Sequence, residues 1–258
     1  RQVLDRASRH VDARFPGQGR LYGSVVPTMN RVLQAMGRPI RGPNDKCAIL
    51  LLDAYQTCGT VPVDAAALGD HVLVVAAGHK QLRAGTGAGF LYTPRALLPA
   101  LTPRRTGWWN HRAPFAFEKG PVQRADDGTR FRTGTPTVIA MAMMLGELAA
   151  LGTSAGGDLG AAVQRARRVT QALVDTMLQS CARRGMRVRG DWPSARRAAF
   201  VCVEVHDGPR VNETLTRQGI RVDFRPREGT TGWVRVSGNA AAFPYEVEAV
   251  IEAIARAR

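Results

Sequence analysis

The segment Cys47-Ala48-Ile49-Leu50-Leu51-Leu52-Asp53 decides the fold, because six apolar residues in a row end abruptly in a carboxylate. A short continuous apolar run of this kind is typical of a strand that is buried on both faces. A second run, Val72-Leu73-Val74-Val75, and a third, Phe90-Leu91-Tyr92, follow downstream. Between the first two, Ala65–Leu68 predicts a short helix. Strands joined by helical crossovers indicate an α/β layer structure.

Asp53 and Lys80 stand just after the first two predicted strands. Lys80 closes Ala76-Ala77-Gly78-His79-Lys80, and a glycine-rich run, Gly85–Tyr92, follows it. A lysine amine can form a Schiff base with an aldehyde, and a carboxylate can hold a pyridine nitrogen protonated. The pair therefore predicts a site for pyridoxal 5'-phosphate (PLP). The apolar residues before Lys80 favour the partial desolvation that an unprotonated amine needs near neutral pH.

Composition narrows the class of protein. The chain has 258 residues and is 45% hydrophobic, which is enough for one large domain or two small ones. No apolar run approaches the roughly 20 residues of a membrane span, and the N-terminus lacks a signal-peptide pattern. The four cysteines form no CxxC pair. We therefore expect no membrane association, no metal site and a reducing, cytoplasmic location.

The charge is strongly positive, with a formal net charge of +15 at pH 7. The excess is mostly arginine and is scattered in pairs such as Arg104-Arg105 and Arg167-Arg168. No long basic block, zinc finger or RNA-binding motif accompanies these pairs. The pattern favours an arginine-rich solvated surface over a nucleic-acid partner.

The chain divides into three predicted parts. Residues 1–45 form a divergent N-terminal segment, residues 46–158 a partial PLP-binding large domain, and residues 159–258 a linking helix and a small C-terminal domain. In the large domain, Thr137–Leu151 predicts an apolar helix whose segment Met141–Leu145 packs in the core. The remaining predicted elements are helices at Leu159–Arg184, Val211–Gln218 and Tyr245–Ala255, and strands at Ala198–Val205, Ile220–Phe224 and Trp233–Ser237.

Four motifs in order resemble the class V aminotransferase family, PLP-dependent enzymes of fold type I that include kynureninases and isopenicillin N epimerase-like enzymes. The motifs are Asp53–Asp64, Gly78–Tyr92, Thr133–Pro136, and a C-terminal set made of Gly219–Pro226, Val234–Ser237 and Tyr245–Glu248. The resemblance covers roughly residues 47–258. It implies an α/β fold: part of a fold type I large domain with a mixed sheet and helices, plus a small C-terminal α+β domain.

The resemblance also implies roles around the cofactor. Lys80 would form the Schiff base and then shuttle a proton at the substrate Cα. Asp53 would pair with the pyridinium nitrogen, and Gln56 would hydrogen-bond the phenolic oxygen of the ring. His79 would contact the phosphate, and Thr135 would reach the phosphate of a partner subunit, which implies a homodimer. For each residue, an ordinary surface, turn or loop role is the alternative.

Other matching positions would bind the substrate. Arg235 would hold the α-carboxylate, because its planar fork suits a carboxylate better than lysine does. Trp108, Trp109 and His111 resemble the Gly-Trp-x-x-His segment of kynureninase-like members and would line the pocket. The alternatives are an exposed strand arginine and simple loop packing.

The resemblance thus implies a PLP-dependent enzyme that acts on a small-molecule α-amino acid, by transamination or by kynureninase-like cleavage. No cysteine lies between Asp223 and Thr231, which argues against a cysteine desulfurase. Family members carry a longer N-terminal part, with an aromatic ring stacked on PLP and a helix N-terminus at the phosphate. Residues 1–45 show neither pattern. The alternative is therefore a truncated, catalytically inactive homologue that acts as a binding or assembly partner.

Overall fold

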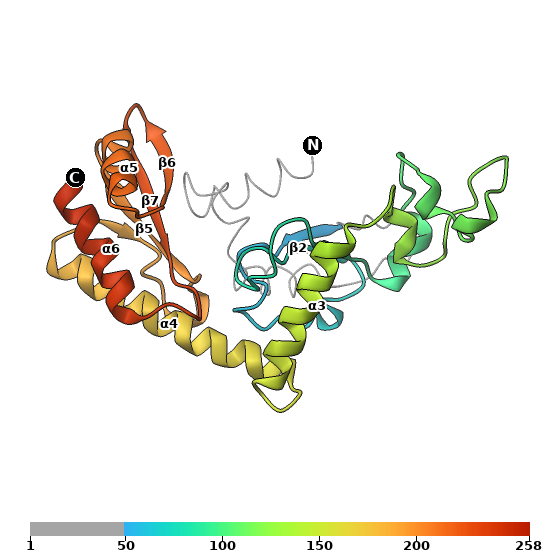
Figure 1. The fold of residues 1–258 in the computed structure, drawn as a ribbon, viewed down its shortest axis with the longest axis horizontal. Coiled ribbons are helices and arrows are strands. Elements are labelled where there is room, and N and C mark those ends of the chain that lie inside the picture. The colour runs from blue at the N-terminus through green and yellow to red at the C-terminus, as the bar shows by residue number, and fades with distance from the viewer. Residues whose placement is uncertain (1–48) are drawn as a thin grey trace, which may run out of the picture. The chain divides into compact units, whose positions relative to one another are not determined.

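The computed structural model describes residues 49–258, and Figure 1 traces their element order. The described residues form two compact units. The first holds residues 49–58 and 63–151, and the second holds residues 59–62 and 152–258. Each unit contains one sheet, with three strands in the first and four in the second.

The first sheet is mixed. Its strands are β1 (Leu50–Asp53), β2 (Val72–Ala77) and β3 (Gly89–Tyr92), in that spatial order. β1 and β2 run parallel, whereas β3 is antiparallel to β2. A parallel pair needs a long crossover, and here the crossover contains the short 3-10 helix η2 (Ala66–Leu68). The carboxyl ends of β1 and β2 therefore meet at one edge of the sheet.

β1 is not buried on both faces, so that expectation is wrong for the residues described. Leu52 is buried beneath the crossover, together with Val72 and Val74 of β2. Leu51 points to the opposite face and is 60% exposed. Among residues 49–258 the crossover covers only one side of the strand. The continuous apolar run therefore does not show that both faces of β1 are buried. Cys47 and Ala48 lie outside the described residues.

The long connection from β3 to the next helix is mostly loop and is interrupted by four short 3-10 helices. They are η3 (Arg95–Ala100), η4 (Trp108–Asn110), η5 (Pro114–Ala116) and η6 (Gly128–Phe131). The helix that follows, α3 (Val138–Thr153), is apolar on all sides apart from Glu147. One side of α3 meets the glycine-rich segment, where Met144 lies against Gly78.

The expected core packing of Met141–Leu145 is correct only in part. Met144 is half-buried, but Met141 and Met143 are exposed and Leu145 is 65% exposed. A helix that is apolar all round needs cover on every side, and the described residues cover α3 on one.

The C-terminal unit is an antiparallel sheet backed by helices. Its strand order is β4-β5-β7-β6. One expectation needs correction, because the strand expected at Ile220–Phe224 begins at Asp223 and continues to Glu228. The sheet also contains a short strand at Val188–Arg189 that the sequence did not predict. The elements are α4 (Leu159–Arg183), β4 (Val188–Arg189), η7 (Ser194–Arg196), β5 (Phe200–Val205), α5 (Gly208–Arg217), β6 (Asp223–Glu228), β7 (Thr231–Ser237) and α6 (Pro244–Ala257).

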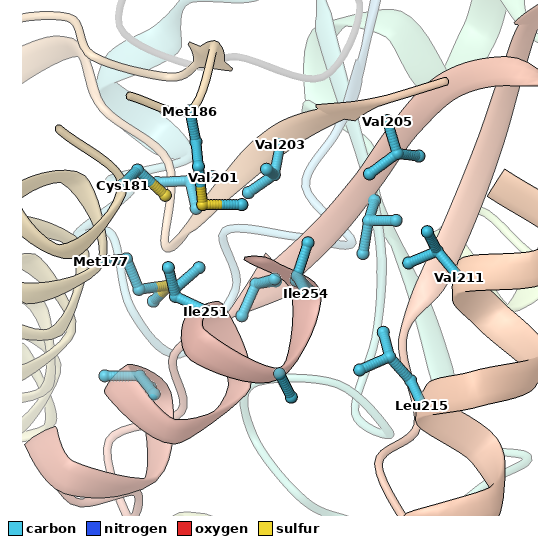
Figure 2. Packing of buried hydrophobic residues seen from close by; sticks show 14 of the residues in the cluster. Met177, Cys181, Met186, Val201, Val203, Val205, Val211, Leu215, Ile251 and Ile254 are labelled. Atoms are coloured by element: carbon cyan, nitrogen blue, oxygen red, sulfur yellow. The ribbon is translucent and has the colours of Figure 1, made fainter. Parts of the chain in front are cut away.

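The core of this unit lies between the sheet and its three helices. Alternate residues of β5 and β7 are buried, as a sheet covered on one face requires. Figure 2 shows side chains of α4, α5 and α6 meeting the valines of β5. The labelled members are Met177, Cys181, Met186, Val201, Val203, Val205, Val211, Leu215, Ile251 and Ile254. The other face of the sheet carries half-buried polar and aromatic side chains.

Candidate functional site

Asp53 lies at the carboxyl end of β1, opposite Val75 in the parallel register. The backbone N–H of Tyr55 donates to Asp53 Oδ1 at 2.9 Å. The backbone N–H of Ala54 in turn donates to the carbonyl of Val75 at 2.8 Å, which ties the chain leaving β1 to β2. The carboxylate is therefore held at the edge where the two parallel strands end, and its residue is exposed there.

Lys80 lies in a tight turn that follows β2 at the same edge. The carbonyl of Lys80 accepts from the N–H of Arg83 at 3.0 Å, and the carbonyl of Gly78 accepts from Ala84 at 2.9 Å. Arg83 adopts the left-handed conformation (φ 59°) that closes the turn. A Cβ on Gly78 would lie 2.9 Å from that of Ala84, so the turn requires glycine there. Lys80 is half-buried.

Tyr55 contacts both of these residues, although no sequence signal described above predicts a role for it. Its ring centroid lies 5.6 Å from Lys80 Nζ and 6.0 Å from the ring centroid of His79. The structure thus brings Asp53, Tyr55, His79 and Lys80 together. The signal that could have found Tyr55 is its place two residues after Asp53, where the chain leaves a parallel strand. Gln56 comes next and is half-buried.

A second group of predicted residues gathers where two loops of the same unit touch. A Cβ on Gly107 would lie 1.7 Å from the carbonyl oxygen of Thr133, so only glycine allows this approach. The contact sets Trp108 beside the start of the Thr133–Pro136 turn. Thr135 in that turn is exposed. The ring centroids of Trp108 and Trp109 lie 4.8 Å apart, and both rings contact that of Phe115.

His111 already has local partners. Its Nδ1 accepts from the N–H of Ala113 at 3.1 Å, and its Nε2 lies 3.7 Å from Glu118 Oε2. The neighbouring Asn110 is fully buried, and neither its Nδ2 nor its Oδ1 finds a hydrogen-bond partner among the described residues. No sequence signal described above predicts a role for Asn110. The described geometry supports a structural role for His111 at least as directly as a substrate contact.

Arg235 belongs to the C-terminal unit, on β7. Its Nη2 lies 2.6 Å from Asp223 Oδ2 on β6, and its guanidinium carbon lies 5.4 Å from the ring centroid of Phe200 on β5. Neither Asp223 nor Phe200 was predicted as a site residue. Both are cross-strand neighbours that only the register of the sheet reveals.

The thiols among residues 49–258 are poor nucleophiles in their surroundings. Burial raises the pKa of Cys202, although the nearby Arg235 and Arg189 oppose the shift. Burial likewise raises the pKa of Cys58. A thiol with a raised pKa carries little thiolate near neutral pH.

Between residues 49 and 258, no group of three His, Cys, Asp or Glu side chains could hold a metal ion. No helix in that range is both long and apolar enough to cross a membrane.

Comparison with known proteins gives a consistent result. The family described as Aminotransferase class-V matches residues 33–232. A kynureninase of Burkholderia mallei (strain SAVP1) is 30% identical over 181 residues, which cover 69% of this chain and 42% of the relative. The chain therefore spans less than half the length of the curated kynureninases that it matches.

Solved structures share the fold. The apo cysteine desulfurase of Thermococcus onnurineus NA1 has a TM-score of 0.66 and 21% identity, over 81% of this chain and 52% of that one. A variant of the lyase C-DES, with glycine covalently linked to its PLP cofactor, has a TM-score of 0.68 and 19% identity, over 92% and 58%. The expected fold class, part of an α/β fold type I large domain with a small α+β domain, is confirmed. The chain belongs to the class V aminotransferase family.

Proposed function

We propose that this chain carries the lysine-bearing part of a PLP-dependent enzyme that acts on an α-amino acid. The observation that supports this most directly is the parallel pairing of β1 and β2. It brings the carboxylate of Asp53 and the turn of Lys80 to one edge of the sheet, where Tyr55 contacts both.

The chemistry of these side chains fits PLP. The Lys80 amine suits the aldehyde carbon, and the Asp53 carboxylate suits the ring nitrogen. Gln56 can donate to the phenolic oxygen, and His79 can donate to the phosphate. When bound, PLP supplies an electron sink for bond cleavage at the substrate Cα.

The residues of the chain would then do the following work. Asp53 keeps the ring nitrogen protonated by ion pairing. Lys80 would hold the cofactor and would take or return the proton at the substrate Cα. Arg235 binds the α-carboxylate through a bidentate contact.

Two reactions remain in this proposal, transamination and kynureninase-like hydrolysis. Kynureninases among the relatives and the Gly107–His111 segment support the second, with Trp108 in the pocket and His111 either there or in loop packing.

We also propose a homodimer, in which the exposed Thr135 reaches the phosphate bound by the other subunit. The described cysteines, Cys58, Cys181 and Cys202, are free thiols, which supports a reducing compartment such as the cytoplasm.

The competing proposal is an inactive homologue that serves as a binding or assembly partner. The exposed apolar surface of α3 favours it. Ile139 is 77% exposed, and Leu145 is similarly open among the described residues. A large exposed apolar patch marks an interaction site.

Absorbance separates the two proposals. Purified chain mixed with PLP should develop a band near about 410–430 nm, typical of a lysine-bound cofactor. The band should vanish in Lys80→Ala and persist in Lys119→Ala, because Lys119 is an exposed lysine in the same unit. No band with the wild-type chain would favour the inactive homologue.

A further inference from the structure

The outer face of the C-terminal sheet carries an ordered row of side chains. In the register, Cys202 of β5 lies between Arg189 of β4 and Arg235 of β7. Asp223 of β6 lies on the other side of Arg235. Directly opposed residues on adjacent strands present their side chains on the same face, within about 4.5–5.5 Å at Cβ. The row thus places a carboxylate directly beside the arginine proposed to bind substrate.

Arg235 is held on two sides. Its Nη2 contacts Asp223 Oδ2 at 2.6 Å, while the ring of Phe200 packs against the guanidinium, 5.4 Å from centroid to Cζ. The Arg235 side chain is 23% exposed and that of Asp223 is 36% exposed. An ion pair that is partly shielded from water, between residues on paired strands, fixes the direction of a side chain that otherwise has many rotamers.

Asp223 is also shared with a second arginine. The Nε and Nη2 of Arg225 lie 3.0 Å and 2.9 Å from the same Oδ2. The three side chains together keep one net positive charge. The negative charge of Asp223 is therefore offset on its own strand, which limits its repulsion of an incoming carboxylate.

We propose that Asp223 is a positioning residue, which orients Arg235 to bind the α-carboxylate of the substrate. This inference rests on the proposed function, which gives Arg235 that ligand. A guanidinium carries five N–H donors in a planar fork, enough to serve two carboxylates. Binding to an arginine that is already oriented costs less side-chain entropy than binding to a mobile one. We expect this gain to exceed the residual repulsion between the two carboxylates.

The test compares Asp223→Asn with wild type in the full chain. The variant keeps the shape of the side chain and removes its charge. Binding of L-alanine is followed at the Nε–Hε NMR signal of Arg235, which is assigned by its absence in Arg235→Lys. L-Alaninamide, which lacks the carboxylate, is the matched ligand. Glu213→Gln is the matched variant, because it removes an exposed ion pair with Arg217 on α5 of the same unit.

Asp223→Asn should weaken L-alanine binding about tenfold, the scale of losing a group that orients a ligand-binding residue. Binding of L-alaninamide should not change, and Glu213→Gln should alter neither ligand. Equal or tighter L-alanine binding in Asp223→Asn would overturn the proposal. An equal loss for both ligands would also overturn it, since the effect of Asp223 would then not act through the carboxylate that Arg235 is proposed to bind.

The readout separates this inference from the proposed function. The NMR signal reports on Arg235 itself and needs no cofactor. If the wild-type chain binds PLP but L-alanine leaves the Arg235 signal unchanged, the inference fails and the cofactor proposal stands. If the wild-type chain does not bind PLP but L-alanine shifts the signal, the proposed function fails and Asp223→Asn still decides the inference.

Discussion

The amine nitrogen of Lys80 lies 5.6 Å from the centroid of the Tyr55 ring. A cation at this distance over an aromatic face gains about 0.5–1 kcal/mol at an exposed site. The backbone of the same tyrosine donates to Asp53 at 2.9 Å. Tyr55 therefore contacts both residues on which the proposed cofactor site depends, Asp53 through its backbone and Lys80 through its ring.

Removing the Tyr55 ring should make the Lys80 side chain more mobile. We expect Tyr55→Ala to weaken PLP binding by a factor of about 2–5, because the ring holds the Lys80 side chain in place through a contact worth about 0.5–1 kcal/mol. Tyr55→Phe keeps the ring and should bind PLP like wild type. The measurement is the dissociation constant from absorbance titration. If Tyr55→Ala retains wild-type affinity, the contact has no role in the site.

Asp53→Asn should separate cofactor attachment from catalysis. The asparagine oxygen can still accept from the Tyr55 N–H, so the local turn should persist. The charge that holds the ring nitrogen protonated is lost, and turnover should fall about a hundredfold or more, the scale of removing one preorganised electrostatic group. The absorbance band and the turnover of an amino acid are measured on the same sample. Undiminished turnover would contradict the role proposed for Asp53.

Gly107→Ala should destabilise the N-terminal unit. The new Cβ would lie 1.7 Å from the Thr133 carbonyl oxygen, which is backbone and cannot swing away. Overpacking of this kind costs about 1–3 kcal/mol. Gly128→Ala is the control, because nothing lies within 4 Å of its Cβ position. Thermal unfolding should show a lower Tm for Gly107→Ala alone, and equal values would show that the two loops do not touch as described.

Cys181 should make stability fall at alkaline pH. Burial raises its pKa to about 11, whereas the unfolded chain ionises the thiol at its lower, ordinary pKa. Its contribution is complete below the ordinary value and is lost as pH rises through about 11. Urea unfolding across this range should show a steeper loss in wild type than in Cys181→Ala. Parallel curves for the two proteins would contradict the assignment.

The sequence predicted the regular elements well where one physical signal dominates. The strand that ends at Asp53 follows from a continuous apolar run, and the helix that begins at Leu159 follows from its amphipathic period. β4 escaped prediction because two residues, Val188 and Arg189, give no measurable period. The exposure of Leu51 and Leu145 was not predicted either. An apolar sequence indicates that burial is favourable, but it does not show which residues pack against it.

The residues of the candidate site likewise divide into those that the sequence predicts and those that only the structure reveals. Asp53 and Lys80 could be named because strand ends are visible in sequence, and their cofactor roles remain predictions. Tyr55 depends on how a side chain turns back toward Lys80. The pairing of Asp223 with Arg235 depends on strand register, which a hairpin fixes through its turn and bulge rather than through composition.

Covalent attachment of PLP to Lys80 is the step on which the proposed function depends, and chemical trapping detects it. The chain contains only three lysines, Lys46, Lys80 and Lys119. The PLP-treated protein is reduced with borohydride, which makes the lysine–cofactor bond permanent, and its peptides are analysed by mass spectrometry. We predict the pyridoxyl adduct on the peptide that contains Lys80, and none on the other two. An adduct on Lys46 or Lys119 in its place, or no adduct at all, would show that Lys80 does not bind the cofactor.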